Sequence, residues 1–162
     1  FKVTKKGIYF EELYFKIVLL NMDTFFVLND KEDFKTDPQY AGNVIFYKKS
    51  KDASIAAVQQ DLFSKLISKA LQLPLQQFLF IDVASTSPRF ATIHKEIGIK
   101  KCFLFGVNEN EIGLNATIPF YQLTKIINTD FIKADAPEVL EKDKNKKSKL
   151  WQQLLITFNI QA

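Results

Sequence analysis

The sequence has few of the residues from which catalytic and metal-binding sites are usually built. Among its 162 residues it has one cysteine, Cys102, one histidine, His94, and one arginine, Arg89. A single cysteine excludes an internal disulfide and suits a reducing compartment, so we expect a cytoplasmic protein. One histidine gives no basis for a Ser-His-Asp arrangement or a histidine metal cluster. We expect His94 to be a partly exposed structural residue and Cys102 a small buried core side chain, with no catalytic residue, metal or cofactor.

Glycine is also scarce, with five in the chain. The G-x-G-x-x-G and Walker-type loops need glycine so that the backbone can approach a phosphate closely, and neither pattern occurs. The net charge of +4 comes almost entirely from lysine. Because arginine is the side chain suited to bidentate contacts with phosphate and guanine, a sequence-specific nucleic-acid binder with a single arginine would be unusual.

Long apolar runs are missing as well. No apolar stretch reaches the roughly twenty residues needed to cross a bilayer, so we expect no membrane span. Hydrophobic residues nevertheless make up 47% of the chain and aromatic residues 14%, well above the content of a disordered chain. At this length the composition predicts a single domain over residues 1–162, in which residues 1–30 are a candidate partner-binding arm that precedes the core.

The order of the elements that the sequence predicts is strand, helix, strand, helix, strand. The strands are expected at 43–49, 77–83 and 100–106, and the helices at 52–73, from the Ser/Thr/Pro stretch after residue 84 up to Gly98, and from Pro137 onward. The helix at 52–73 is expected to bury Ile55, Val58, Leu62, Leu66, Ala70 and Leu73. Residues 107–115 suit a turn or hairpin loop, and 116–127 suit a strand or a helix start. This order predicts a three-layer, Rossmann-like α/β fold with a mainly parallel central sheet flanked by helices.

Enzymes of this class usually place their site at the carboxyl ends of the strands. The best candidate is the loop after the second predicted strand, because the helix N-terminus that follows it can bind an anion. Its polar residues are Asp82, Ser85, Thr86, Ser87 and Arg89. The loop has no glycine, and a plain helix cap by Ser85 or Ser87 is the simpler interpretation. A small α/β nucleotide- or phosphate-binding enzyme that uses Asp82, Ser85, Ser87 and Arg89 is therefore the alternative function.

Two further stretches are candidate interaction surfaces. The aromatic segment "LLNMDTFFVLND" suits either an edge strand or an apolar peptide that docks into another protein. Its apolar residues are Leu20, Met22, Phe25, Phe26 and Leu28. The lysine run at 142–149 is able to attract polyanions, but it contains Asp143 and borders Glu141. We favour a solvated helix face for the lysine run over nonspecific nucleic-acid binding.

Taken in order, these pieces resemble the psi subunit family of bacterial DNA polymerase III, a small protein of the clamp-loader assembly. "LLNMDTFFVL" is similar to the family's amino-terminal segment, although the family typically has a tryptophan where this chain has Phe25 or Phe26. "NVIFYKKS" and "DLFSKLISKALQLPLQQFLFID" resemble its first strand, helix and second strand. "KSKLWQQLLITF" resembles its carboxy-terminal helix, in which a leucine, a tryptophan and two glutamines occur together. The likeness spans about residues 19–158 and leaves residues 1–18 without a counterpart.

The resemblance implies a function without catalysis. In that family the fold is α/β with a parallel central sheet, the amino-terminal segment binds the clamp loader's subunits, and the folded domain binds the chi subunit, which contacts single-stranded DNA-binding protein. The implied clamp-loader peptide consists of Leu20, Met22, Phe25, Phe26 and Leu28. Trp151 would lie on the closing helix, where it either packs that helix on the sheet or helps to form the chi-facing surface. We therefore expect a non-catalytic adaptor with clamp-loader and chi-like partners.

Overall fold

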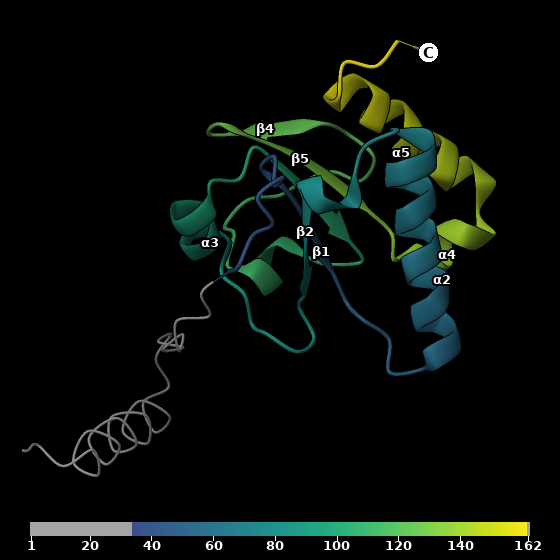
Figure 1. Cartoon of the computed structure of the whole chain (residues 1–162), viewed down its shortest axis with the longest axis horizontal. Coiled ribbons are helices and arrows are strands. Elements are labelled where there is room, and N and C mark those ends of the chain that lie inside the picture. The colour runs from purple at the N-terminus through teal and green to yellow at the C-terminus, as the bar shows by residue number, and fades with distance from the viewer. Residues whose placement is uncertain (1–33, 162) are drawn as a thin grey trace, which may run out of the picture. The chain divides into compact units, whose positions relative to one another are not determined.

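The structure, a computed structural model, describes residues 34–161 (Figure 1). The strands are β1 (Asn43–Tyr47), β2 (Phe78–Asp82), β3 (Lys101–Phe105), β4 (Thr124–Ile126) and β5 (Thr129–Ala134). The helices are α2 (Ala53–Ser64), α3 (Phe90–Ile97), α4 (Pro137–Lys142) and α5 (Lys144–Thr157). Shorter pieces are a π-helical turn, Lys65–Ala70, and two 3₁₀ turns, Leu75–Gln77 and Glu109–Ile112.

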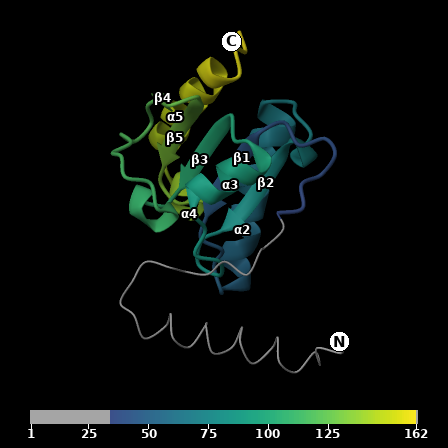
Figure 2. The ribbon, with the colours of Figure 1, turned by 90° about the vertical axis from the view of Figure 1, so that its left-hand side faces the viewer.

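The five strands form one sheet in the order β2-β1-β3-β5-β4. All neighbouring pairs are parallel except β4 and β5, which are antiparallel. Helices α2, α4 and α5 lie on one face of the sheet and α3 lies on the other, in front of the sheet in Figure 2. The predicted three-layer, Rossmann-like α/β fold is confirmed.

Each face of the sheet carries its own buried cluster. On the side of α2, α4 and α5, residues such as Ile45, Phe63, Phe103 and Leu154 pack together. On the side of α3, Phe46, Ile93, Leu104 and Phe131 pack together with Cys102. Strands β1 and β3 supply alternate residues to both clusters, which is why their sequences are almost wholly apolar. Each fully buried phenylalanine or leucine side chain contributes about 1.5–3 kcal/mol to this core.

Helix α2 differs from the predicted helix in its length and in its buried face. The carboxylate of Asp52 accepts hydrogen bonds from the N–H groups of Ser54 and Ile55 and so begins the helix. Beyond Ser64 the hydrogen bonding changes, because the N–H of Leu71 bonds to the carbonyl of Leu66, five residues back. The regular helix therefore ends well before Pro74, which the sequence predicts to end it.

Of the six residues predicted to form the buried face, Leu62 and Leu66 are buried and the other four are not. Ile55 and Val58 lie in the first turns, which the rest of the described chain leaves exposed. The five-residue hydrogen-bonding turn brings Ile67 and Leu71 into the core, while Ala70 is exposed and Leu73 packs partly buried against the same cluster.

Helix α3 confirms one predicted boundary and corrects the other. It ends at Gly98, which has a φ of 67° and whose N–H bonds to the carbonyl of His94. Its N-cap residue is Arg89, which makes no capping side-chain hydrogen bond, so neither Ser85 nor Ser87 caps the helix. The physical reason is spacing, because Pro88 and Arg89 separate both serines from the first helical residue, Phe90.

The carboxyl-terminal third differs from the prediction in the number and kind of its elements. Strand β5 was not predicted, and it lies directly beside β3 in the sheet. The closing helix is two helices, since the backbone breaks at Asp143, whose carboxylate accepts hydrogen bonds from the N–H groups of Asn145 and Lys146 and begins α5. The predicted loop at 107–115 contains a 3₁₀ turn with a capping box between Asn108 and Glu111. No helix within residues 34–161 is long and apolar enough to cross a membrane.

Gly106 gives a direct test of the packing between the end of β3 and the start of α4. Its φ is +64°, and a Cβ atom built there would lie 2.8 Å from the Cβ and 3.0 Å from the Cα of Ala136. Gly113 has nearly the same φ, +66°, but its nearest neighbour, the Cγ of Arg89, is 3.8 Å away. Both alanine variants lose about 1–2 kcal/mol to the left-handed backbone conformation. We predict that Gly106→Ala loses about 1–3 kcal/mol more, through overpacking.

Urea unfolding of the two variants measures this difference. Equal losses for Gly106→Ala and Gly113→Ala would contradict the close approach of β3 and Ala136.

Candidate functional site

The strand order reverses between β1 and β3, and α/β proteins commonly bind ligands at the carboxyl ends of the strands at such a point. Here two ion pairs occupy that place. The Nζ of Lys48, which follows β1, lies 2.7 Å from a carboxylate oxygen of Glu111. The Nζ of Lys133 on β5 lies 2.9 Å from a carboxylate oxygen of Glu109. The side chains of the second pair are only 9% and 12% exposed, so this ion pair is a nearly buried part of the domain.

The two glutamates are held in their charged form. Partial burial works against the charge of Glu109, but the hydrogen bonds from the Nζ of Lys133 and the N–H of Ile118 outweigh it and lower the pKa of this carboxyl. Burial opposes the charge of Glu111 as well. The N–H of Asn108 and the ammonium of Lys48 again lower its pKa. Sequence analysis missed both glutamates, because their lysine partners are distant along the chain.

Gln59, in the middle of α2, ties this helix to the same end of the sheet. Its side-chain N–H groups donate to the carbonyl of Lys48 at 2.9 Å and to the carboxylate of Glu138 at 3.1 Å, and its carbonyl oxygen accepts from the N–H of Ser50 at 3.1 Å. A buried glutamine is favourable only when it is hydrogen-bonded in this way. Gln59 and the ion pairs therefore provide hydrogen-bond partners for the polar groups between β1 and α2.

A second polar cluster lies where β5 ends. The hydroxyl of Tyr121 donates to the carboxylate of Asp135, which also lies 3.1 Å from the Nζ of Lys146. Burial and this contact with Asp135 raise the pKa of Tyr121, so the phenol stays protonated. Lys146 belongs to the lysine run, and its neighbour Lys147 pairs with Glu141 at 3.0 Å. Part of the run is therefore neutralised within the domain.

The loop after Asp82, the alternative ligand site, has its carboxylate engaged by its own surroundings. Partial burial opposes the charge of Asp82, but hydrogen bonds from the N–H of Lys49, the hydroxyl of Ser85 and the N–H of Ala84 outweigh it and lower the pKa. The hydroxyl of Thr86 donates to the backbone carbonyl of Asp82. Ser87 is exposed and Arg89 is half-buried at the start of α3. These residues lie in one loop, as the sequence predicts. The hydrogen bonds within the loop and from Lys49 account for the position and charge of the Asp82 carboxylate without a ligand.

The remaining candidates for chemistry have structural positions. The Nδ1 of His94 accepts a hydrogen bond from the N–H of Ile99, and its ring stacks on Phe90 with centroids 5.5 Å apart. Cys102 is fully buried, and burial raises the pKa of its thiol well above the ordinary value. The predicted positions, partly exposed for His94 and buried for Cys102, are confirmed. Within residues 34–161 no group of three histidine, cysteine, aspartate or glutamate side chains is placed to hold a metal ion.

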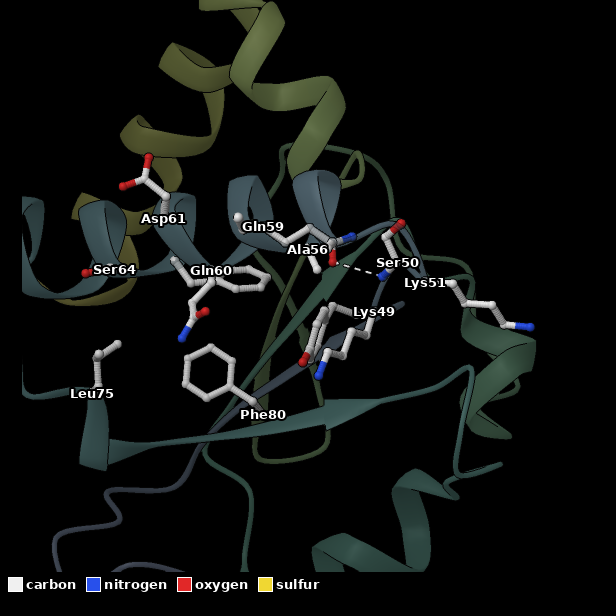
Figure 3. Close-up of a pocket in the computed structure, with 14 residues that line it drawn as sticks. Lys49, Ser50, Lys51, Ala56, Gln59, Gln60, Asp61, Ser64, Leu75 and Phe80 are labelled. Atoms are coloured by element: carbon white, nitrogen blue, oxygen red, sulfur yellow. Dashed lines mark hydrogen bonds between the residues drawn. The ribbon is translucent and has the colours of Figure 1, made fainter.

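An open groove of about 950 Å³ lies between α2 and β2 (Figure 3). Tyr47, Phe63 and Phe80 form its aromatic floor, with ring centroids of Phe63 and Phe80 5.4 Å apart. Small and amide side chains of α2 form one wall: Ala53, Ala56, Ala57 and Gln60. Figure 3 shows Leu75 at one end and Lys49 and Lys51 at the other. We call this surface the α2–β2 groove.

Of the predicted partner-binding residues, only Trp151 lies within the described part of the chain. It is half-buried on α5 and packs against the cluster that contains Leu150 and Leu154. This position shows that Trp151 packs α5 on the sheet; a part of its side chain stays exposed. Leu20, Met22, Phe25, Phe26 and Leu28 lie outside residues 34–161. Sequence analysis did not find the α2–β2 groove, because its residues are contributed by two strands and a helix.

Comparison with known proteins adds no relative. No protein-family model matches the sequence, and no curated protein matches it either.

The pair of Lys133 and Glu109 predicts a pH-dependent contribution to stability. The pKa of Glu109 is lowered on folding, so its ionised form stabilises the domain above the ordinary glutamate pKa of 4.5, and this stabilisation is lost as the pH falls through the lower, folded-state pKa. Lys133→Met removes the partner of a partly buried carboxylate. We expect it to lower the free energy of unfolding by about 1–3 kcal/mol at neutral pH, with the difference from wild type shrinking at acid pH.

Denaturant unfolding between neutral pH and pH about 3 measures both quantities. Lys65→Met is the matched control, since Lys65 pairs with Asp61 on the exposed surface and should change stability by less than about 1 kcal/mol at any pH. A Lys133→Met penalty that is constant with pH would show that the loss comes from packing alone.

Proposed function

We propose that the chain is a non-catalytic adaptor subunit of the bacterial replicase clamp loader. It bridges the clamp-loader ATPase to a chi-like partner, which in turn contacts single-stranded DNA-binding protein. Its partners are proteins, it binds no nucleic acid sequence-specifically, and it works in the cytoplasm.

The observation that carries this proposal is the contrast between two surfaces of the domain. At the carboxyl ends of β1 and β3, where an α/β enzyme builds its site, Lys48, Glu109, Glu111 and Lys133 pair with one another. Charged groups that neutralise one another are poor ligands for a charged substrate. The open surface is instead the α2–β2 groove, whose floor is aromatic. An open surface with aromatic side chains at its floor suits a protein partner better than a small polar substrate.

The order of elements and the sequence likeness also favour an adaptor. The stretches that resemble the psi subunit family include β1, the last turn of α2 and β2, and the "LWQQL" stretch lies on α5, the last helix. The half-buried position of Trp151 suits a residue that packs its helix and leaves an edge for a partner. The clamp-loader peptide of this proposal is the segment at 19–30.

Phe25 and Phe26 are the proposed anchors of that peptide. Phe25→Ala together with Phe26→Ala is expected to weaken binding to the clamp-loader ATPase subunit by more than about 2 kcal/mol, because aromatic anchors carry most of the energy at an interface centre. Thermal unfolding of the variant should match wild type. A pull-down titration with the purified ATPase subunit measures the change.

The matched control is Tyr9→Ala with Phe10→Ala, an aromatic pair in the region without a family counterpart. It should leave binding unchanged. If the wild-type chain does not retain the ATPase subunit, the proposal is wrong in its main part. If the Phe25/Phe26 variant fails to fold, both rings belong to the core and the peptide is misassigned.

The alternative, a nucleotide- or phosphate-binding enzyme that uses Asp82, Ser85, Ser87 and Arg89, makes an opposite prediction. A ligand that binds only the folded state raises the melting temperature by mass action. We expect inorganic phosphate and nucleoside mono- and triphosphates to leave the melting temperature of the full chain unchanged. A rise that Asp82→Asn abolishes would favour the enzyme over the adaptor.

A further inference from the structure

The two edges of the sheet differ in a way that the rest of the domain does not explain. Strand β4, at one edge, has three residues with Lys125 exposed in the middle, and short charged edges discourage pairing with other chains. Strand β2, at the other edge, has five residues and reads "FLFID". It has no lysine, proline or bulge, and among residues 34–161 it pairs with β1 alone. An apolar edge strand of this kind is a template for a further strand.

The hydrogen-bonding direction along β2 can be worked out from one bond. The N–H of Val83 donates to the carbonyl of Tyr47 at 2.9 Å, which points toward β1. Because backbone groups alternate in direction along a strand, Ile81 and Leu79 also bond toward β1. The N–H and carbonyl groups of Phe80 and the carbonyl of Phe78 therefore point away from β1, toward the open edge, whereas the N–H of Phe78 donates to the carbonyl of Leu75.

The α2–β2 groove runs beside this open edge. Phe80 presents its half-buried ring to the groove from β2, and Leu75, 37% exposed, lies before the start of the strand. At the other end lie Lys49 and Lys51, whose Nζ atoms have no carboxylate of residues 34–161 within ion-pair distance, although Lys49 is near enough to Asp82 to lower its pKa. The surface thus offers three features along one line: backbone groups without a partner in the described chain, a groove with an aromatic floor, and two lysines.

We propose that β2 accepts an extended segment of a partner protein as an additional strand of the sheet. The segment has apolar side chains at alternate positions, which enter the α2–β2 groove, and an acidic residue at the end that meets Lys49 and Lys51. Main-chain hydrogen bonds to Phe80 and to the carbonyl of Phe78 supply affinity, while the groove and the lysines supply specificity. The partner's acidic end follows from charge complementarity.

This inference deepens the proposed function, since it gives the form in which a partner of the adaptor is recognised. It does not require that partner to be the clamp loader. A second copy of this chain could also add to β2, but its β2 would bring another Lys49 and Lys51 to the interface in place of the acidic residue. The test below separates the two occupants.

The first measurement is residue-resolved amide hydrogen exchange on the full chain. In the free protein, the amide of Phe80 should exchange at least about a hundredfold faster than that of Ile81, its neighbour, which bonds to β1. Equal protection of the two amides in a monomeric sample would mean that something within the chain already covers the edge. That result would overturn the proposal. A dimer in sedimentation velocity that Ala57→Arg dissociates would identify a second copy as the occupant and would overturn it too.

The second measurement uses defined probes, fluorescent peptides of about ten residues in which valine and threonine alternate, long enough to span β2. One peptide carries glutamates at its amino end, and a second carries them at its carboxyl end. Two matching control peptides carry lysines in place of the glutamates. We expect one glutamate peptide to bind, to protect the amide of Phe80, and to bind more tightly than its lysine counterpart. N-methylation of alternate residues should abolish binding, because it removes the strand hydrogen bonds.

Variants of the protein complete the test. Ala57→Arg fills the groove and should weaken peptide binding by about tenfold or more, whereas Val58→Arg, next to it on α2 but outside the groove, should leave binding unchanged. Lys49→Glu with Lys51→Glu should reverse the preference in favour of the lysine peptide. Peptide binding that is unchanged by Ala57→Arg and by Lys49→Glu with Lys51→Glu, or no binding by any peptide, would overturn the proposal and leave the clamp-loader titration unaffected.

Discussion

Both faces of a parallel sheet must be covered, and this requirement governs the rest of the structure. Strands β1 and β3 are covered on both faces. On one face Val44, Phe46, Cys102 and Leu104 are buried against α3 and the residues after β3. On the opposite face α2, α4 and α5 cover these strands. Covering the middle of the sheet in this way uses all four described helices. Strand β2, at the edge, keeps an exposed side next to α2, and the α2–β2 groove is the result.

The same arrangement decides what the carboxyl ends of the strands can do. The chain places Lys48 after β1, Lys133 on β5, and Glu109 and Glu111 in the 3₁₀ turn after β3, so that each charge has an opposite charge within hydrogen-bonding distance. These pairs hold the turn against the sheet, with Glu109 also accepting the N–H of Ile118. The groups that an α/β enzyme directs at its substrate are here directed at each other. We propose that recognition takes place at the edge of the sheet instead.

The sequence predicted the fold well where a single segment carries the signal. The apolar runs of β1, β2 and β3 and the glycine that ends α3 depend on local spacing, and all were found. The sequence did not predict the switch to five-residue hydrogen bonding after Ser64 or strand β5, whose "TDFIKA" alternates weakly. Nor did it predict that the apolar strand β2 lies at an edge, because strand order depends on contacts between distant segments.

The candidate site shows the same limit. Structural roles for His94 and Cys102 could be inferred from their rarity and their neighbours in the sequence. Lys133 and Glu109 pair although they are 24 positions apart, and the sequence around neither residue predicts this ion pair. Likewise the α2–β2 groove brings together Tyr47, Phe63 and Phe80 from three elements. Residues chosen by resemblance at 20–28 lie outside the described part of the chain, so they stay predictions.

The central proposal is that this protein acts through surfaces that other proteins cover, rather than through chemistry at the ends of its strands. Hydrogen exchange of the full chain with and without the clamp-loader ATPase subunit tests it most directly. The account predicts new protection within residues 19–30, with exchange at the 3₁₀ turn after β3 unchanged. An absence of protection anywhere in the chain, or protection confined to the carboxyl ends of β1 and β3, would contradict it.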